Sequence, residues 1–261
     1  MKNLLASAEK AAKAAGAIIK NRFETDFQVD LKGPGDLVTE VDRACEDKIR
    51  SILAEEHPEI AFWGEESGST DRNATYSWVV DPLDGTKNFV HGYPFVAVSI
   101  GLVRNSHPIL GVVYDPLRDE LFSAYEGRGT TLNGRPVSVS QTSKVNDALI
   151  VTALNSMPKR QMELIWQACM YCQGVRRGGA AALDLAQIAA GRVDAAWEWS
   201  LHPWDLAAAY VLITEAQGTV TQPDGKPFDL HAGRVLATNT NLHRAFSAMV
   251  NSSAEASPKS P

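Results

Sequence analysis

Two aspartates, Asp81 and Asp84, lie three residues apart where an apolar segment of the chain ends. The β-branched run at 78–80 predicts a buried strand, and Pro82 and Gly85 predict a corner that stops it. Two carboxylates held side by side on such a corner raise each other's pKa. A hard cation such as Mg²⁺, Mn²⁺ or Ca²⁺ removes that cost, because carboxylate oxygens are its preferred ligands. The pair therefore indicates a metal site, and the alternative is a strand-to-loop corner with capping aspartates.

Acidic residues follow apolar residues at two further places. Glu65 and Glu66 end a short apolar run, and Asp205 lies in the first turn of a helix that Pro203 predicts. The helix dipole favours an anion in that turn. Each of the three places is explicable as a cap, but together they indicate a site for more than one metal ion. Just past the first corner, the amides of Gly85 and the next residue could bind an anion.

Three segments carry these residues: Gly-Glu-Glu-Ser at 64–67, Asp-Pro-Leu-Asp-Gly-Thr at 81–86 and Trp-Asp-Leu-Ala-Ala at 204–208. In this order they resemble the three signatures of the inositol monophosphatase family. The members of this family are Mg²⁺-dependent, lithium-sensitive phosphomonoesterases. The resemblance extends over nearly the whole chain, from 36 to 218. It implies an α+β fold, the layered α/β/α/β/α sandwich of the inositol monophosphatase and fructose-1,6-bisphosphatase type.

The resemblance also implies a role for each matching residue. The metal ligands would be Glu65, Asp81, the Leu83 carbonyl, Asp84 and Asp205. Two or three Mg²⁺ ions are expected, with Mn²⁺ as a substitute. Glu65 and Thr86 would orient and deprotonate the attacking water, and Asp42 would hydrogen-bond the threonine. The expected substrate contacts are Gly85, Thr86, Ala181, Glu198 and Asp205, and attack should be direct and in line.

The activity implied is that of an inositol-phosphate phosphatase, which hydrolyses a sugar or inositol monophosphate such as myo-inositol 1-phosphate. Fructose-1,6-bisphosphatase, histidinol phosphatase and 3′(2′),5′-bisphosphate nucleotidase activities stay open. So does a regulatory metal-binding protein that acts through a protein partner. Lys87, Ala180 and Gln217 depart from the family pattern, but none is a matched metal ligand, so they bear on substrate choice. A homodimer is expected.

Composition sets limits on these interpretations. The 261 residues carry a net charge of -6, which argues against nucleic acid as the main ligand. No apolar run is long enough to span a bilayer, and Lys10 and Lys13 interrupt what would be the apolar part of a signal peptide. Three cysteines without such a signal are expected to stay reduced, so we expect a cytoplasmic protein.

Local patterns predict the elements that must position these residues. Helices are expected at 3–23 and from Thr39 as N-cap, with a Gly/Pro loop at 31–37 between them. Strands are expected at 60–63, 77–81, 95–104, 109–115 and 120–124, the last three as an antiparallel meander. The second half alternates, with strands at 148–153, 192–198, 218–222 and 234–238 and helices at 158–171, 180–190, 203–216 and 241–250. We expect one catalytic domain over 1–250 and a disordered tail over 251–261.

Other features favour structural roles. Cys169 and Cys172 form a C-x-x-C pattern, but near the end of a predicted helix, where the dipole does not favour a thiolate. Zinc would need further soft ligands, and Cys45 is distant in the sequence. For Arg176 and Arg177 the sequence leaves two roles open. They are either a solvated pair, or they contact a substrate phosphate or an oligomer partner.

Overall fold

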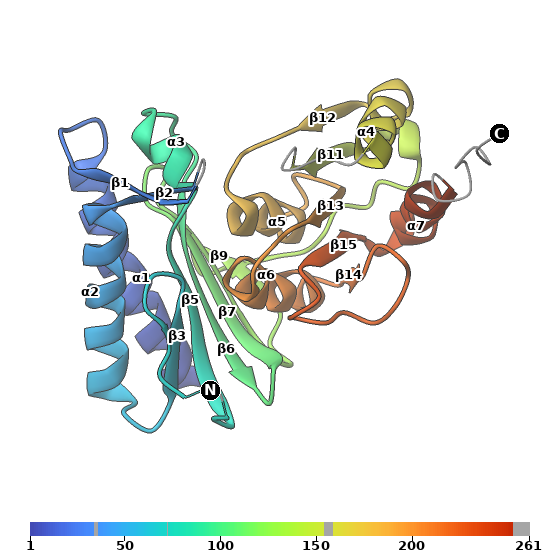
Figure 1. Ribbon diagram of the computed structural model, residues 1–261. Coiled ribbons are helices and arrows are strands. Elements are labelled where there is room, and N and C mark those ends of the chain that lie inside the picture. The colour runs from blue at the N-terminus through green and yellow to red at the C-terminus, as the bar shows by residue number, and fades with distance from the viewer. Residues whose placement is uncertain (34–35, 72, 154–158, 253–261) are drawn as a thin grey trace.

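In the computed structural model, helices and sheets alternate in five layers (Figure 1). The structure describes residues 1–33, 36–71, 73–153 and 159–252. Three separate clusters of buried apolar side chains fill the spaces between the layers. This arrangement confirms the predicted α/β/α/β/α sandwich.

The first layer consists of α1 (Lys2–Arg22) and α2 (Glu40–Glu56). The small residues of α1, among them Ala8, Ala11 and Ala15, are fully buried and let the helix lie close to α2 and the sheet. Thr39 caps α2 in a capping box with Asp42, as the sequence predicted. Each helix presents one apolar stripe to the sheet, which is the pattern of an amphipathic surface helix.

The segment predicted as a loop at 31–37 is largely a hairpin. Strands β1 (Val29–Gly33) and β2 (Asp36–Thr39) pair antiparallel. The loop prediction was therefore wrong for all but 34–35, which lie outside the described residues. Gly33 suggested a break in regular structure, whereas it is the last residue of β1 and pairs with Asp36 of β2.

The first sheet has eight strands in the order β10-β9-β8-β7-β6-β5-β3-β4. The bounds are β3 Ala61–Gly64, β4 Gly68–Ser69, β5 Tyr76–Asp84, β6 Ala97–Arg104, β7 His107–Asp115, β8 Glu120–Tyr125, β9 Thr130–Leu132 and β10 Arg135–Val137. Strands β6, β7 and β8 form the predicted antiparallel meander. The short strands β4, β9 and β10 were not predicted.

Strand β5 does not stop at Asp81 as the sequence suggested. It pairs with β6 through Asp81–Ser99, shifts register, and pairs again through Asp84–Ala97. Pro82, which has no N–H to donate, occupies the bulge. The bulge keeps both aspartates on one strand and turns them toward the same end of the sheet. The short helix α3 (Thr86–Val90) follows directly.

The middle layer consists of α5 (Ala181–Ala189) and α6 (Pro203–Glu215), which pack between the two sheets (Figure 1). Helix α6 lies directly on the first sheet at Gly101 and Gly111, which face each other on β6 and β7. A Cβ at Gly111 would lie 2.3 Å from the Ala208 carbonyl oxygen, and one at Gly101 would lie 2.6 Å from the Ala207 Cβ. Only residues without a side chain allow this close approach.

The second sheet has the order β12-β11-β13-β15-β14. The bounds are β11 Leu149–Thr152, β12 Gly174–Arg176, β13 Ala195–Trp199, β14 Gly218–Thr221 and β15 Arg234–Asn239. The last layer is α4 (Lys159–Tyr171) and α7 (His243–Ser252), and single 3₁₀ turns occur at Val145–Asp147 and Thr240–Leu242. These elements follow the predicted alternation. The tail predicted to be disordered lies, from 253 onward, outside the described residues.

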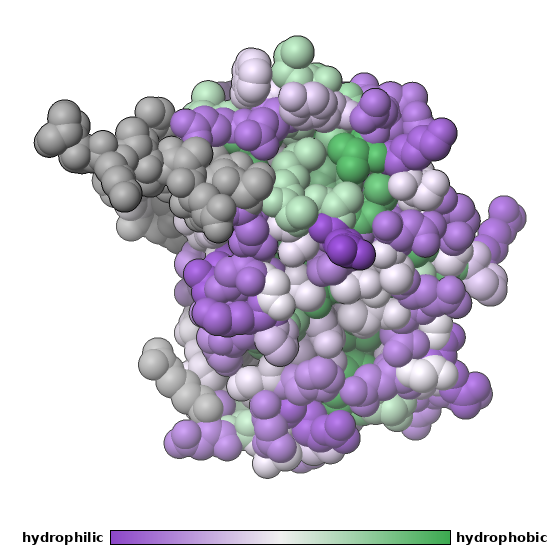
Figure 2. All heavy atoms as spheres, turned by 90° about the vertical axis from the view of Figure 1, so that its right-hand side faces the viewer, coloured by the Kyte–Doolittle hydropathy of each residue, from purple (hydrophilic) through white to green (hydrophobic). Residues whose placement is uncertain are grey.

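The outer face of α4 carries several exposed apolar side chains. Met162, Trp166 and Met170 recur every four residues and are 55%, 64% and 62% exposed. Figure 2, which views this side of the molecule, shows an apolar area in its upper part among mostly hydrophilic residues. The inner face of α4, with Leu164 and Ala168, packs on the second sheet.

Candidate metal centre and active site

A cavity of about 450 Å³ opens where the carboxyl ends of β5 and β13 meet the first turns of α3, α5 and α6. Its lining includes every predicted site residue except Asp42: Glu65, Asp81, Leu83, Asp84, Gly85, Thr86, Ala181, Glu198 and Asp205. The first and last of these residues, Glu65 and Asp205, are 140 positions apart in the sequence. The two sheets and the middle helices bring them together.

Three carboxylates form the centre of the cavity. Asp81, Asp84 and Asp205 each offer an oxygen, and these oxygens all lie within 4.8 Å of one another. Asp81 accepts the N–H of Leu83 at 3.0 Å, Asp84 accepts the N–H of Ala181 at 2.9 Å, and Asp205 accepts the N–H of its N-cap His202 at 2.7 Å. Backbone amides therefore fix the orientation of each carboxylate before any ligand binds.

The electrostatics of this cluster are unfavourable without a cation. Burial, and then the charge of Asp205, raises the pKa of Asp84 to about 8. Burial raises the pKa of Asp205 to about 7, with the charge of Glu65 adding to the effect. The pKa of Asp81 is also well above its ordinary value, from burial and the neighbouring carboxylates. These carboxylates are unfavourable as anions unless a cation is present, and their oxygens are hard ligands. Both properties are expected of a site for Mg²⁺ or a similar ion.

Glu65 borders this cluster without belonging to it. Its charge raises the pKa of both Asp81 and Asp205, and its N–H donates to the Val80 carbonyl at 3.0 Å. The corner that carries Glu65 is fixed by Glu46 of α2, whose carboxylate accepts the N–H of Glu66 at 2.9 Å. Glu46 is buried, and sequence reasoning did not identify it.

Thr86 and Asp42 are connected as the sequence predicted. The Thr86 hydroxyl donates to Asp42 Oδ1 at 2.9 Å, and the other Asp42 oxygen accepts the N–H of Thr39 at 2.8 Å and the Thr39 hydroxyl at 2.5 Å. Both oxygens of Asp42 are thus occupied, and burial raises its pKa despite these bonds. The Leu83 carbonyl lies 3.2 Å from the Thr86 hydroxyl and competes for the same proton. When the proton is donated to Asp42, the Thr86 oxygen can only accept from a group in the cavity.

Gly85 makes the turn from β5 into α3 with φ +92, a conformation that residues with a side chain rarely adopt. A Cβ there would lie 3.0 Å from the Phe95 carbonyl oxygen and 3.1 Å from the Ala180 Cβ. The turn therefore also permits close packing against the start of α5. It leaves the first amides of α3, which lack intrahelical acceptors, at the cavity wall.

On the opposite wall, Glu198 is 3% exposed, and its pKa is raised well above the ordinary value by burial and by the charge of Asp184. Asp184 of α5 also lines the cavity and was missed from the sequence. A signal was present, because Asp184 stands among apolar residues in a helix that is buried on every side. Arg177 lines the cavity too, and its charge lowers the pKa of Glu198 and Asp184. The Ala181 N–H, a predicted substrate contact, is already donated to Asp84.

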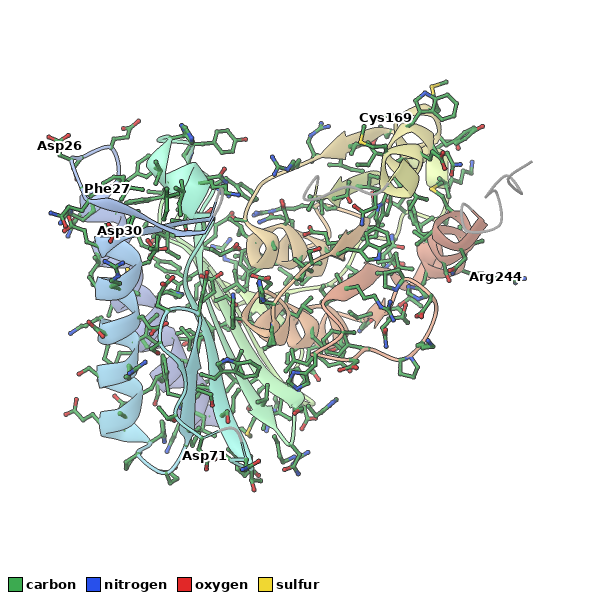
Figure 3. All side chains as sticks on the ribbon, in the orientation of Figure 1. Asp26, Phe27, Asp30, Asp71, Cys169 and Arg244 are labelled. Atoms are coloured by element: carbon green, nitrogen blue, oxygen red, sulfur yellow. The ribbon has the colours of Figure 1, made fainter. Side chains whose placement is uncertain are left out.

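The C-x-x-C pair lies outside this site. Cys169 is exposed on the outer helix α4 (Figure 3), and Cys172 follows at the end of that helix. Burial, with the charge of Cys169 next, raises the pKa of Cys172 to about 11, which disfavours a reactive thiolate. Within the described residues, none of the helices combines the length and apolar character that crossing a membrane requires.

Comparison with known proteins gives a consistent result. The inositol monophosphatase family model matches residues 1–258. Inositol-1-monophosphatase of Synechocystis is 43% identical over 246 residues, covering 92% of this chain and 86% of that protein. The Nus factor SuhB of Pseudomonas aeruginosa is 40% identical over 261 residues, covering 94% and 95% of the two chains.

Solved structures agree in fold. The inositol monophosphatase from Anabaena superposes with a TM-score of 0.86 at 38% identity and covers 96% of each chain. The extragenic suppressor protein suhB from Bartonella henselae gives a TM-score of 0.90 at 35% identity, covering 95% of this chain and 97% of its own. A family match over nearly all residues and a shared fold of this quality leave one assignment: the chain belongs to the inositol monophosphatase family.

Proposed function

We propose that this protein is a Mg²⁺-dependent phosphatase that hydrolyses a sugar or inositol monophosphate, with myo-inositol 1-phosphate as the first candidate. The observation that supports it most is the cluster of Asp81, Asp84 and Asp205, whose oxygens lie within 4.8 Å of one another beside the Thr86–Asp42 pair. Several relatives at about 40% identity carry the name inositol monophosphatase.

The site would hold two or three Mg²⁺ ions, or Mn²⁺ in their place. Ligands would come from Glu65, Asp81, the Leu83 carbonyl, Asp84 and Asp205. When bound, Mg²⁺ neutralises charge on the phosphate and the leaving oxygen and lowers the pKa of a water molecule. Raised pKa values in the free carboxylates mean that loading the site releases protons, so occupancy should increase with pH.

The chain's own groups would then position the reactants. Thr86 Oγ1, with its proton donated to Asp42, accepts a hydrogen bond from the attacking water, and Glu65 takes that water's proton. The amides of Gly85 and Thr86 bind phosphate oxygens. On the far side, Glu198 contacts hydroxyl groups of the leaving alcohol. The Ala181 backbone would contact them through its carbonyl oxygen, because its N–H is donated to Asp84. Among the described residues, no cysteine lines the cavity, which supports direct in-line attack by water.

A phosphate-release panel tests this function. The substrates are myo-inositol 1-phosphate, fructose 1,6-bisphosphate, histidinol phosphate and 3′-phosphoadenosine 5′-phosphate, each with Mg²⁺ and with or without Li⁺. We expect the fastest Mg²⁺-dependent release from myo-inositol 1-phosphate, and inhibition by Li⁺. Release that does not depend on Mg²⁺, or none from any substrate, would overturn the proposal. Preference for another substrate would retain the chemistry and change the specificity.

A second function is supported by the 40% identity to a protein named as a Nus factor. In that case the chain would act through a protein partner, and the metal site would be secondary. Pull-down with tagged parent protein and with an Asp84→Asn variant separates the two. A partner that is retained equally by both, together with absent turnover, would favour the regulatory role. The homodimer expected of the family also stays a prediction, which light scattering of the purified protein can test.

A further inference from the structure

Asp184 is a buried carboxylate to which the proposed mechanism gives no role. It is 6% exposed, lies in the first turns of α5 and lines the cavity. Glu198 and Asp84 are its acidic neighbours, and Arg177 is a nearby cation. Burying a charge next to other carboxylates is costly unless hydrogen bonds or a ligand compensate it. The question is which groups satisfy its two oxygens.

One oxygen is anchored by backbone amides. Asp184 Oδ2 accepts the N–H of Gly178 at 3.0 Å and the N–H of Gly179 at 3.3 Å. The same turn is held from its other side by Asn88, whose amide donates to the Gly178 carbonyl at 2.9 Å and the Phe95 carbonyl at 2.7 Å. The Asp184 carboxylate packs closely against Gly178, since a Cβ at Gly178 would lie 2.2 Å from Asp184 Oδ1. The orientation of the Asp184 carboxylate is therefore fixed before a substrate arrives.

The other oxygen has no donor in the part of the chain that the structure describes. Among the described residues, none donates a hydrogen bond to Asp184 Oδ1 or to either side-chain oxygen of Glu198. Both side chains line the same cavity, and Asp184 is the neighbouring charge that raises the pKa of Glu198 most. A neutral side chain with one carbonyl oxygen could anchor the glycine turn equally well. The second oxygen thus indicates a ligand that donates hydrogen bonds.

We propose that Asp184 is a specificity-determining residue. Its free oxygen, with the carboxylate of Glu198, forms a pair of acceptors that binds two neighbouring hydroxyl groups of a polyol monophosphate. This inference rests on the proposed function and extends it, because it selects esters of polyols over esters of simple alcohols or phenols. Hydrogen bonds from hydroxyls to carboxylates are charge-assisted and strong, and preorganised acceptors gain most from them.

Asp184→Asn is the variant that separates recognition from anchoring. The asparagine carbonyl can still accept both glycine amides, while its NH₂ replaces the free acceptor with a donor. With Mg²⁺, kcat/KM for myo-inositol 1-phosphate should fall roughly 10- to 100-fold, chiefly through KM. The loss for p-nitrophenyl phosphate, which presents no hydroxyl groups, should be much smaller. Asp194→Asn is the matched control, because Asp194 is also 6% exposed and accepts the Leu149 N–H at 2.7 Å but lies outside the cavity lining.

A binding measurement makes the result independent of turnover. Saturation-transfer NMR with free myo-inositol, in Mg²⁺ and inorganic phosphate, should show contact in the parent and in Asp194→Asn and a weaker signal in Asp184→Asn. Equal losses on both esters, or no loss on either, would overturn the role of Asp184. If the parent hydrolyses neither ester, the proposed function fails, and the NMR comparison still decides whether Asp184 recognises the polyol.

Discussion

Asp84 Oδ1 accepts the N–H of Ala181 at 2.9 Å, although the two residues are separated by 97 positions in the chain. Asp84 ends a strand of the first sheet, and Ala181 begins a helix of the middle layer. The second oxygen of Asp84 accepts the N–H of Leu183 at 3.2 Å. A residue proposed to hold the metal is therefore oriented by the other half of the molecule, and the site is complete only when both halves are packed.

Replacing Asp84 tests the metal centre. Asp84→Asn keeps the shape and one acceptor oxygen but removes the charge, so Mg²⁺-dependent turnover should fall by orders of magnitude while the fold persists. Phosphate release and Mg²⁺ titration calorimetry measure the two effects. Asp47→Asn on the exposed face of α2 is the control and should behave as the parent. Near-normal turnover in Asp84→Asn would contradict the proposed site.

Thr86→Val removes the hydroxyl group that bonds Asp42 while keeping the side-chain shape. We expect kcat at saturating Mg²⁺ to fall roughly 10²- to 10⁴-fold, the scale for loss of a group that takes part in proton transfer. Asp42 Oδ1 would lose its partner, so unfolding free energy should also drop by about 1–3 kcal/mol. Thr86→Ser restores the hydroxyl and should recover most of kcat. If serine gives no recovery, the hydroxyl is not the active group.

Glu198→Gln separates recognition from chemistry. The residue accepts no hydrogen bond from the described side chains or amides and is not among the matched metal ligands. Its loss should lower kcat/KM for polyol phosphates by an amount that corresponds to about 1–3 kcal/mol. The fall in kcat/KM for p-nitrophenyl phosphate should be much smaller. The measurement is the ratio of kcat/KM for the two substrates in parent and variant. An equal loss on both would mean that Glu198 supports the site in general and does not contact the polyol.

The raised carboxylate pKa values predict how stability responds to pH. In metal-free protein, Asp84 with a pKa of about 8 and Asp205 with a pKa of about 7 bind protons more tightly folded than unfolded. Their contribution to stability is therefore present below pH 4 and is lost as pH rises through 7 to 8. Mg²⁺ replaces the protons, so the rise in Tm on adding Mg²⁺ should be larger at pH 8 than at pH 6.

Thermal unfolding in EDTA and in excess Mg²⁺ at both pH values measures this effect. Asp84→Asn removes one titrating group, so between pH 6 and pH 8 its Tm in EDTA should fall less than that of the parent. A Mg²⁺ effect of the same size at both pH values, or a parallel fall of both proteins, would show that these carboxylates are not the groups responsible.

Most helices and the meander were predictable because their apolar periodicity is strong and local. Helix α2 is an example, where Thr39 and Asp42 mark the start in the sequence and form the capping box in the structure. The hairpin of β1 and β2 was not predictable in this way, since short strands depend on pairing with each other and Gly33 suggested a loop. The bulge in β5 was missed because the sequence shows Pro82 but not the partner strand that continues beyond it.

The site was predictable in its residues but not in its geometry. Motif order identified Asp81, Asp84 and Asp205, whereas their mutual distance depends on how closely α6 packs on the first sheet. Asp184 escaped notice because a lone acidic residue in a helix usually faces solvent. Its burial follows from the second sheet, which covers α5 on the side that would otherwise be exposed.

The glycine pair on β6 and β7 constrains the proposed metal site from positions outside the cavity lining. Helix α6 contacts the bare backbone at Gly111 through Ala208, one helical turn after Asp205. A methyl group there would push the helix outward and carry Asp205 away from Asp81 and Asp84, which stay with the sheet. The distance between the first sheet and α6 thus sets the position of a proposed metal ligand, and two glycines in the middle of the sheet keep that distance short.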